Sequence, residues 1–398
     1  MSKNLTKAID EEINKIYPEI IKIRNHIHEN PELSEQEYNT SEYICNILTA
    51  NDIEFTRMKK NNGICAIIRG QSNKPCVGIR ADMDALPINE DVEWAHKSKV
   101  PNIMHACGHD IHTSILLGTA IVLKSHSDHL KGSVKFFFQP AEETVGGANS
   151  MISEGVLESP KVDYAIALHI DPSLDVGMVN LCAGPLNGAS KEFEVKLCGK
   201  SSHGAHPNMG IDPIIISCHI ITLLQSGLTR KIDPIQPSLI TVGQMHGGSK
   251  GNIIPDSVTF SGIIRSLNEA NIPKIQDIVQ NICECTANSF GAAVEITFKD
   301  GYPALTNSEE LFPIIKSSCE LALGKSNVLL NQAPSLGCDD FAYFSKSVES
   351  FYYDLGCKKP DCQNSYPLHS SKLDPDPECI KFGIQTQVYS ILKIMGEL

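Results

Sequence analysis

Residues 105–123 read HACGHDIHTSILLGTAIVL, a short polar turn that leads directly into an apolar stretch. The turn carries a thiol, Cys107, and an imidazole, His109, and both are side chains that bind transition metals. From about His112 to Leu123 the apolar residues predict a helix. The stretch therefore predicts a helix placed directly behind a turn that can bind a metal ion.

Short apolar segments alternate with helical patterns on both sides of this stretch, which predicts an α/β fold with a mainly parallel sheet. In such sheets, ligands bind beyond the carboxyl ends of the strands. Asp82 and Asp84 follow one expected strand, and His169 follows another. We therefore expect these segments to meet at one edge of the sheet. The expected strands cover residues 64–68, 76–80, 134–138 and 164–168, and the expected helices cover about residues 5–27 and 35–49.

Adjacent carboxylates, Glu142 and Glu143, follow the strand expected at 134–138. One carboxylate of such a pair can bind a metal ion while the other acts as a base, so the pair and the Cys107 turn together suggest a hydrolytic metal centre. Taken alone, each motif has a plainer interpretation, because a lone cysteine is usually a buried thiol and adjacent glutamates are usually solvated. Their joint occurrence at strand ends favours the metal site.

The length and charge of the chain narrow the class of protein. A chain of 398 residues exceeds the usual size of a single core, so we expect two domains. The hydrophobic content of 41% without a long apolar run, and the absence of a signal-peptide pattern, predict a soluble cytoplasmic protein. The formal net charge of −13 argues against binding to nucleic acid or to an acidic membrane, which leaves a small-molecule substrate.

A second domain is expected between residues 187 and 301, where the pattern changes to strand, helix, strand, strand, helix, strand. That order is typical of a ferredoxin-like α+β domain, and the chain afterwards returns to α/β segments. The sequence therefore predicts a catalytic domain formed by residues 1–186 and 302–398, interrupted by an inserted domain at 187–301, for which the family resemblance described below implies a lid and dimerisation role.

An ordered set of motifs resembles the metal-dependent N-acyl-amino-acid amidohydrolases related to aminoacylase and carboxypeptidase, especially the hippurate hydrolases and plant auxin-conjugate hydrolases. The resemblance spans nearly the whole chain. It implies a metallopeptidase-like catalytic domain that binds two divalent metal ions, zinc or manganese, with cobalt or nickel as further options. The motifs are RADMDALPI at 80–88, the Cys107/His109 turn, Glu142-Glu143 with GGA at 146–148, Leu168-His169 and Leu368-His369-Ser370.

The resemblance also assigns roles to individual residues. Glu142 would be the general base, and Asp84 an orienting carboxylate. A metal pair needs more ligands than one turn supplies. The ions would acidify a bound water so that Glu142 could take its proton, the resulting hydroxide would attack the polarised amide carbonyl, and the same carboxyl could return the proton to the leaving amine. The products would be a carboxylic acid and an amino acid. The implied metal ligands are Cys107, His109, Glu143, His169 and His369.

The inserted domain carries motifs that resemble those of the lid in this family, GKSSHGAHP at 199–207 and GNIIPD at 251–256. They imply that His203 and Asn252 hold the reacting carbonyl or its oxyanion and that Arg265 binds the carboxylate of the amino acid. In several relatives such groups reach across a dimer interface, so a homodimer or homo-tetramer through the lid is expected. The plainer interpretation makes His203 and Asn252 turn residues and Arg265 a surface charge.

One departure affects substrate preference, because this chain has CDDF at 338–341 where the branch commonly has SEDF. The sequence leaves the acyl group open. It also leaves two alternatives: a dipeptidase or carboxypeptidase, and a non-catalytic protein that binds amino-acid conjugates. The intact Glu142 favours an enzyme.

Overall fold

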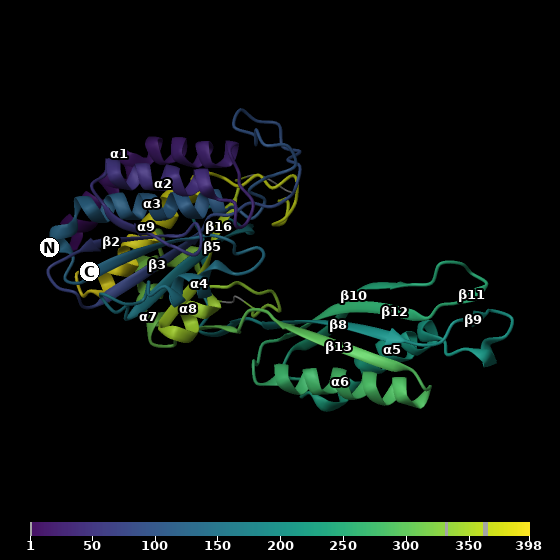
Figure 1. Cartoon of the computed structure of the whole chain (residues 1–398). Coiled ribbons are helices and arrows are strands. Elements are labelled where there is room, and N and C mark those ends of the chain that lie inside the picture. The colour runs from purple at the N-terminus through teal and green to yellow at the C-terminus, as the bar shows by residue number, and fades with distance from the viewer. Residues whose placement is uncertain (1, 331–332, 361–364) are drawn as a thin grey trace. The chain divides into compact units, whose positions relative to one another are not determined.

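The computed structural model describes residues 2–330, 333–360 and 365–398, and the chain forms two compact units. The first unit comprises Met1–Gly184, Thr306–Ala333 and Tyr343–Leu398, and the second comprises Pro185–Leu305 and Pro334–Ala342. Both ends of the chain lie in the first unit (Figure 1). Residues 334–342 belong to the second unit, although the sequence assigned them to the catalytic domain. Backbone hydrogen bonds explain this, because Ser335 N donates to Leu186 O at 2.8 Å.

An eight-stranded sheet forms the centre of the first unit, in the order β1-β2-β4-β3-β5-β16-β6-β15. In the middle of the sheet, the pairs β4–β3, β3–β5 and β5–β16 are parallel. The predicted α/β fold with a mainly parallel sheet is therefore confirmed. The bounds are β1 Glu54–Arg57, β2 Ile64–Arg69, β3 Cys76–Asp82, β4 Ser133–Gln139, β5 Tyr164–Asp175, β6 Val179–Asn180, β15 Val328–Leu329 and β16 Glu349–Lys358.

Both faces of this sheet are buried, as the run of buried residues in β4 shows. Phe136 and Phe138 belong to the main hydrophobic cluster, which also takes in residues of α1, α2, α3, α7 and α9. Phe137 points to the opposite face, where its ring stacks on Phe344 of α8 with centroids 5.2 Å apart. The helices are α1 Ser2–Glu29, α2 Tyr38–Ala50, α3 His109–Ser125, α4 Gly147–Ser153, α7 Leu311–Leu323, α8 Ala342–Ser347 and α9 Cys379–Ile394.

The helix behind the metal-binding turn, α3, begins at His109, three residues earlier than the sequence predicts. The preceding residue, Gly108, has a φ of +81°, which favours glycine. A Cβ atom at this position would lie 2.2 Å from Cδ1 of Ile170 in β5. The glycine therefore lets the turn approach β5 closely, and it brings Cys107 and His109 beside the strand that carries His169.

The second unit contains the predicted ferredoxin-like arrangement, an antiparallel sheet in the order β10-β12-β8-β13 with the helices α5 and α6. Its own hydrophobic cluster lies between the sheet and both helices. The bounds are β8 Ala189–Cys198, β9 Ser202–His203, α5 Pro213–Lys231, β10 Ser238–Gly247, β11 Ile253–Ile254, β12 Ser257–Ser266, α6 Asn271–Ser289 and β13 Ala293–Asp300. The short strands β7 Gly184–Asn187 and β14 Leu305–Asn307 lie where the chain passes between the units.

Among the described residues, no helix has both the length and the apolar character that crossing a membrane requires.

Candidate metal centre

The structure brings the predicted metal ligands of the first unit into overlapping groups. Each group is defined by ligand atoms that all lie within 4.8 Å of one another. The ligands come from four places in the chain: the start of α3, the loop after β4, the strand β5 and the segment that follows β16. The groups are Cys107 with His109 and His169, Cys107 with Glu143 and His369, and His109 with Glu142 and Glu143.

Two buried atoms in this cluster have no hydrogen-bond partner among the described residues, His109 Nε2 and Glu143 Oε1. They lie 3.8 Å apart, and Glu143 Oε1 forms an ion pair with Nε2 of His369 at 3.3 Å. Buried polar atoms held only by such long contacts are poorly satisfied, which is costly. A divalent cation between them would satisfy both, so the residues fit the metal that the sequence implies.

The imidazole of His109 is oriented by a carboxylate. Its Nδ1 donates to Asp84 Oδ1 at 3.2 Å, which directs Nε2 toward Glu143. Burial lowers the pKa of His109, but the negative charge of Asp82, the hydrogen bond to Asp84 and the contacts with Cys107 together outweigh burial and raise the pKa well above the usual range. A metal ion would therefore replace a proton at Nε2, and binding would release that proton.

The second histidine of the cluster, His169, lies inside β5 rather than after it, because β5 continues to Asp175 alongside β16. Its Nδ1 donates to Ile170 O at 2.8 Å, and its Nε2 lies 3.4 Å from Cys107 Sγ. Burial lowers the pKa of His169 to about 4, so the ring is neutral at pH 7 and has a lone pair for a metal. Burial raises the pKa of the Cys107 thiol, and only a nearby cation would favour its thiolate.

A layer of buried polar groups supports the ligands. Asp82 accepts a hydrogen bond from Arg80 Nη1 at 2.7 Å and one from His112 Nδ1 at 2.6 Å. The other ring nitrogen of His112, Nε2, accepts from the backbone N of Ile170 at 2.9 Å. Both ring nitrogens of His112 therefore form hydrogen bonds within the protein, and His112 positions Asp82 and the backbone of Ile170. Asp82 therefore joins the end of β3 to α3 through His112.

The predicted orienting carboxylate, Asp84, accepts hydrogen bonds at both of its oxygens. Besides His109, its donors are Ser34 Oγ at 2.6 Å and the backbone N of Glu143 at 3.1 Å. Burial raises the pKa of Asp84, but the hydrogen bonds from His109, Ser34 and the backbone of Glu143, together with the charge of His109, outweigh burial and lower the pKa. Ser34 lies far from the family motifs in sequence, so no sequence signal identified it.

Backbone strain marks two positions of the cluster. Ala141, which precedes Glu142, has a φ of +58°, and His369 has a φ of +64°. Residues other than glycine occupy this region at an energetic cost, and such outliers are concentrated at functional sites. The Glu142 side chain next to this strained turn is only 8% exposed.

The predicted lid residues all belong to the second unit. His203 in β9 pairs with Ile253 of β11, and Gly204 N donates to Asn252 O at 2.8 Å, so His203 and Asn252 lie close together. Both are exposed. Arg265 lies eight residues beyond the start of β12, about 26 Å along the strand at 3.3 Å per residue. The structure therefore separates Arg265 from the other two residues within one chain.

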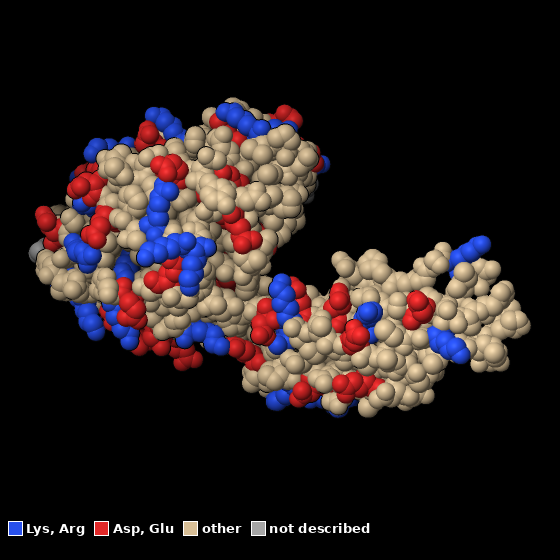
Figure 2. All heavy atoms as spheres, viewed as in Figure 1, with Lys and Arg blue, Asp and Glu red and all other residues tan. Residues whose placement is uncertain are grey.

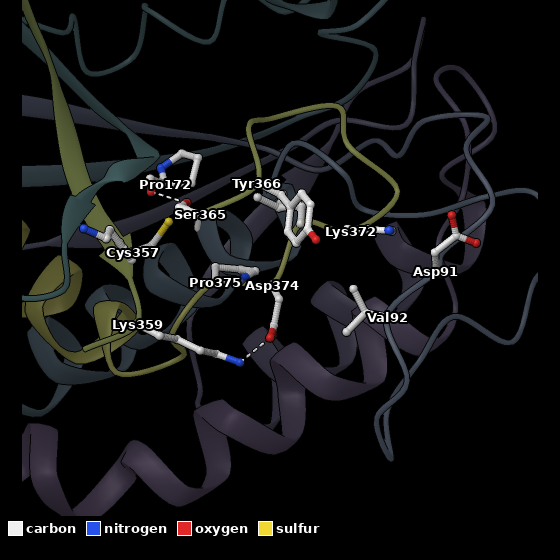
Figure 3. A pocket seen from close by; sticks show the side chains of 12 residues that line it. Asp91, Val92, Pro172, Cys357, Lys359, Ser365, Tyr366, Lys372, Asp374 and Pro375 are labelled. Carbon is white, nitrogen blue, oxygen red and sulfur yellow. Dashed lines mark hydrogen bonds and ion pairs between the residues drawn. The ribbon is translucent and has the colours of Figure 1, made fainter. Parts of the chain in front are cut away.

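A pocket of the first unit lies beside the segment that contains His369 (Figure 3). Its charged groups have partners: Lys359 Nζ pairs with Asp374 at 2.5 Å, and Lys372 Nζ lies 5.7 Å from the ring centre of Tyr366. The described residues that line it include none of the predicted site residues, so we do not assign the substrate to it. The lining residues are Asp91, Val92, Pro172, Cys357, Lys358, Lys359, Ser365, Tyr366, Lys372, Leu373, Asp374 and Pro375.

The sequence profile of the peptidase family M20/M25/M40 matches residues 78–393. The chain belongs to this family. This confirms the resemblance inferred from the motifs and identifies the protein as an amide-hydrolysing enzyme. The matched range includes each of the predicted site residues.

Proteins from bacteria, archaea and plants are similar to the chain. It is 36% identical to thermostable carboxypeptidase 2 of Saccharolobus solfataricus, over 99% of this chain and 100% of the relative. It is 36% identical to N-acetyl-L-cysteine deacetylase of Bacillus subtilis (86% and 82% covered) and 33% identical to IAA-amino acid hydrolase ILR1-like 4 of Arabidopsis thaliana (100% and 90%). A solved structure, the Bacillus subtilis YXEP protein, described as a dinuclear metal-binding peptidase of the M20 family, has a TM-score of 0.83 at 28% identity, covering 97% of this chain and 100% of that one.

Proposed function

We propose that this M20 enzyme hydrolyses the amide bond of N-acyl amino acids and releases a carboxylic acid and a free amino acid. The observation that carries the proposal is the pair of unsatisfied buried atoms, His109 Nε2 and Glu143 Oε1, beside the carboxylate of Glu142. Relatives named as an N-acetyl-L-cysteine deacetylase and an IAA-amino acid hydrolase support this substrate class.

Two divalent ions, when bound, would polarise the amide carbonyl and acidify a water molecule. Glu142 would accept a proton from water and return it to the leaving amine, and the hydrogen bond from His109 Nδ1 to Asp84 keeps the ring of His109 oriented. The dinuclear YXEP protein supports the number of ions. We propose zinc, which the thiolate favours, or manganese, with cobalt or nickel as further options. The ligands would be Cys107, His109, Glu143, His169 and His369.

The lid residues would bind the two ends of the substrate, with His203 and Asn252 at the reacting carbonyl and Arg265 at the carboxylate. Within one chain the distance along β12 separates them by more than the length of a small N-acyl amino acid. This separation supports a homodimer or homo-tetramer in which His203 and Asn252 of one copy serve the centre of another.

The second unit offers an uncharged surface for such an assembly. The helix α5 contains no Asp, Glu, Lys or Arg before Arg230, and its Ile215 and Leu223 are 50% and 45% exposed. The strand β10 lies at an edge of its sheet, and Figure 2 shows mostly tan spheres along that edge. Edge strands and exposed apolar helix faces are surfaces that pair with other chains.

The expected cytoplasmic location stays a prediction.

A second candidate function is that of a carboxypeptidase or dipeptidase, favoured by the 36% identity with the carboxypeptidase of Saccharolobus solfataricus. The two activities differ in what lies on the acyl side of the cleaved bond. The deciding experiment loads the purified protein with zinc or manganese and measures kcat/KM for N-acetyl, N-benzoyl and indole-acetyl amino acids and for dipeptides with the same C-terminal residue. Preference for the dipeptides would overturn the N-acyl assignment, and turnover of neither class would favour the conjugate-binding alternative.

A further inference from the structure

Eight residues, 30–37, join α1 to α2, and we call the last six of them, Glu32–Glu37, the strap. The backbone of its first half contacts Ala85, the residue that follows Asp84. Ala85 N donates to Glu32 O at 2.8 Å, and Leu33 forms a parallel β-bridge with Ala85. The strap therefore lies directly beside the orienting carboxylate of the metal centre.

The strap makes one side-chain contact with that carboxylate. Ser34 Oγ donates to Asp84 Oδ2 at 2.6 Å, while Asp84 Oδ1 accepts from His109 Nδ1 at 3.2 Å. A carboxylate with donors on both oxygens has little freedom to rotate. Ser34 thus restricts the group that sets the orientation of His109.

The strap makes a second contact with the loop that carries the carboxylate pair. Glu37 is fully buried, and its Oε1 accepts from the backbone N of Ala141 at 2.9 Å. Its Oε2 accepts from Asn62 Nδ2 at 3.1 Å. Because Ala141 has a φ of +58°, the turn before Glu142 persists only where its surroundings enforce it. Glu37 provides such a constraint.

We propose that the strap positions the whole metal centre, through Ser34 acting on Asp84 and through Glu37 acting on the Ala141 turn. The two contacts converge, because Asp84 Oδ2 also accepts from Glu143 N at 3.1 Å. Ser34 and Glu37 are positioning residues, since they act through Asp84 and the backbone of Ala141. The inference rests on the proposed function for its metal centre, but its main measurement needs no substrate.

The test compares Ser34→Ala, Glu37→Gln and the double variant with a matched control, Glu32→Gln. Glu32 lies in the same strap, and its carboxylate accepts hydrogen bonds from Asn39 and Thr40 at the start of α2. Zinc affinity is measured by competition with a chromophoric chelator, and kcat, KM and Tm are measured on zinc-saturated protein.

We expect Ser34→Ala to weaken zinc binding by about 10- to 100-fold, the usual effect of losing a group that orients a ligand. Ser34→Thr, which keeps the hydroxyl, should restore the affinity. Glu37→Gln should lower kcat by about 10- to 100-fold with KM within about twofold, because a small displacement of a catalytic group has effects of this size. The loss of zinc affinity in the double variant should differ from the product of the single losses, because the contacts meet at Asp84. Glu32→Gln should lower Tm only.

The proposal is overturned if the Ser34 and Glu37 variants lower Tm as Glu32→Gln does but leave zinc affinity and kcat within about twofold of the wild type. If Glu37→Gln does not fold, an unchanged zinc affinity in Ser34→Ala is enough to overturn it. A wild-type protein that hydrolyses none of the N-acyl amino acids contradicts the proposed function instead, and the zinc measurement still tests the strap.

Discussion

The candidate site residues of the first unit differ from those of the second in how far the surrounding fold fixes them. Cys107 and His109 are buried, and carboxylates or backbone groups orient the rings of His109 and His169. In the second unit, His203 and Asn252 are exposed, on or beside two-residue strands. The metal centre is therefore pre-organised within one unit, whereas the side chains of His203 and Asn252 are open to solvent.

The difference predicts two kinds of mutational effect. Changes in the first unit should alter metal binding or the chemical step, because the groups there are held in place before substrate arrives. Changes in the second unit should alter discrimination between substrates, because the proposed role of its groups is to contact the substrate rather than the metal ions.

The largest effect is expected for Glu142→Gln, which should retain metal but lose about two to four orders of magnitude in turnover, the usual span for a general base. The amide keeps the size of the side chain but cannot accept the proton. The measurements are metal content and kcat of the purified variant. Near-normal turnover in metal-replete protein would remove Glu142 from this role. The adjacent Glu143→Gln is the control, since it should lose metal affinity first.

For Cys107→Ala we expect zinc affinity to fall by more than about 100-fold, because the change deletes a charged ligand rather than a group that orients one. Cys319→Ala, in a fully buried position of α7, is the matched control and should affect stability alone. Competition with a chelator measures both variants. Equal zinc affinity in the two would make Cys107 a structural thiol.

A smaller effect is expected for Arg265→Ala in the second unit. A charge-assisted hydrogen bond contributes about 2 kcal/mol, so kcat/KM for substrates with a free α-carboxylate should fall about 30-fold. The matching carboxamides should lose much less, since they offer no anion to the guanidinium. Arg230→Ala, at the end of α5, is the control in the same unit. An equal loss in both substrate series would show that Arg265 supports folding or assembly instead.

The fold and the position of the cluster were predictable from sequence, because periodicity and strand-end placement are local signals. The strands at 76–80 and 134–138 lie within two residues of β3 and β4, and the turn at Cys107 directly precedes α3. The contact of Ser34 with Asp84 was not predictable, since it joins residues 50 positions apart and Ser34 lies in no distinctive pattern. The start of α3 was not predictable either, because the left-handed φ of Gly108 and its close approach to Ile170 are features of the folded chain.

The smallest effect that still separates the two units is expected for His112→Asn. His112 bridges Asp82 and the backbone of Ile170, the neighbour of His169, so its loss should loosen the His169 side of the centre. We expect zinc affinity to fall about 10-fold, at the lower end of the range for groups behind a ligand, because Arg80 still holds Asp82. His26→Asn, whose ring stacks on Tyr43 away from the cluster, is the control. If His112→Asn instead changed substrate discrimination at constant zinc affinity, the division of labour between the two units would be wrong.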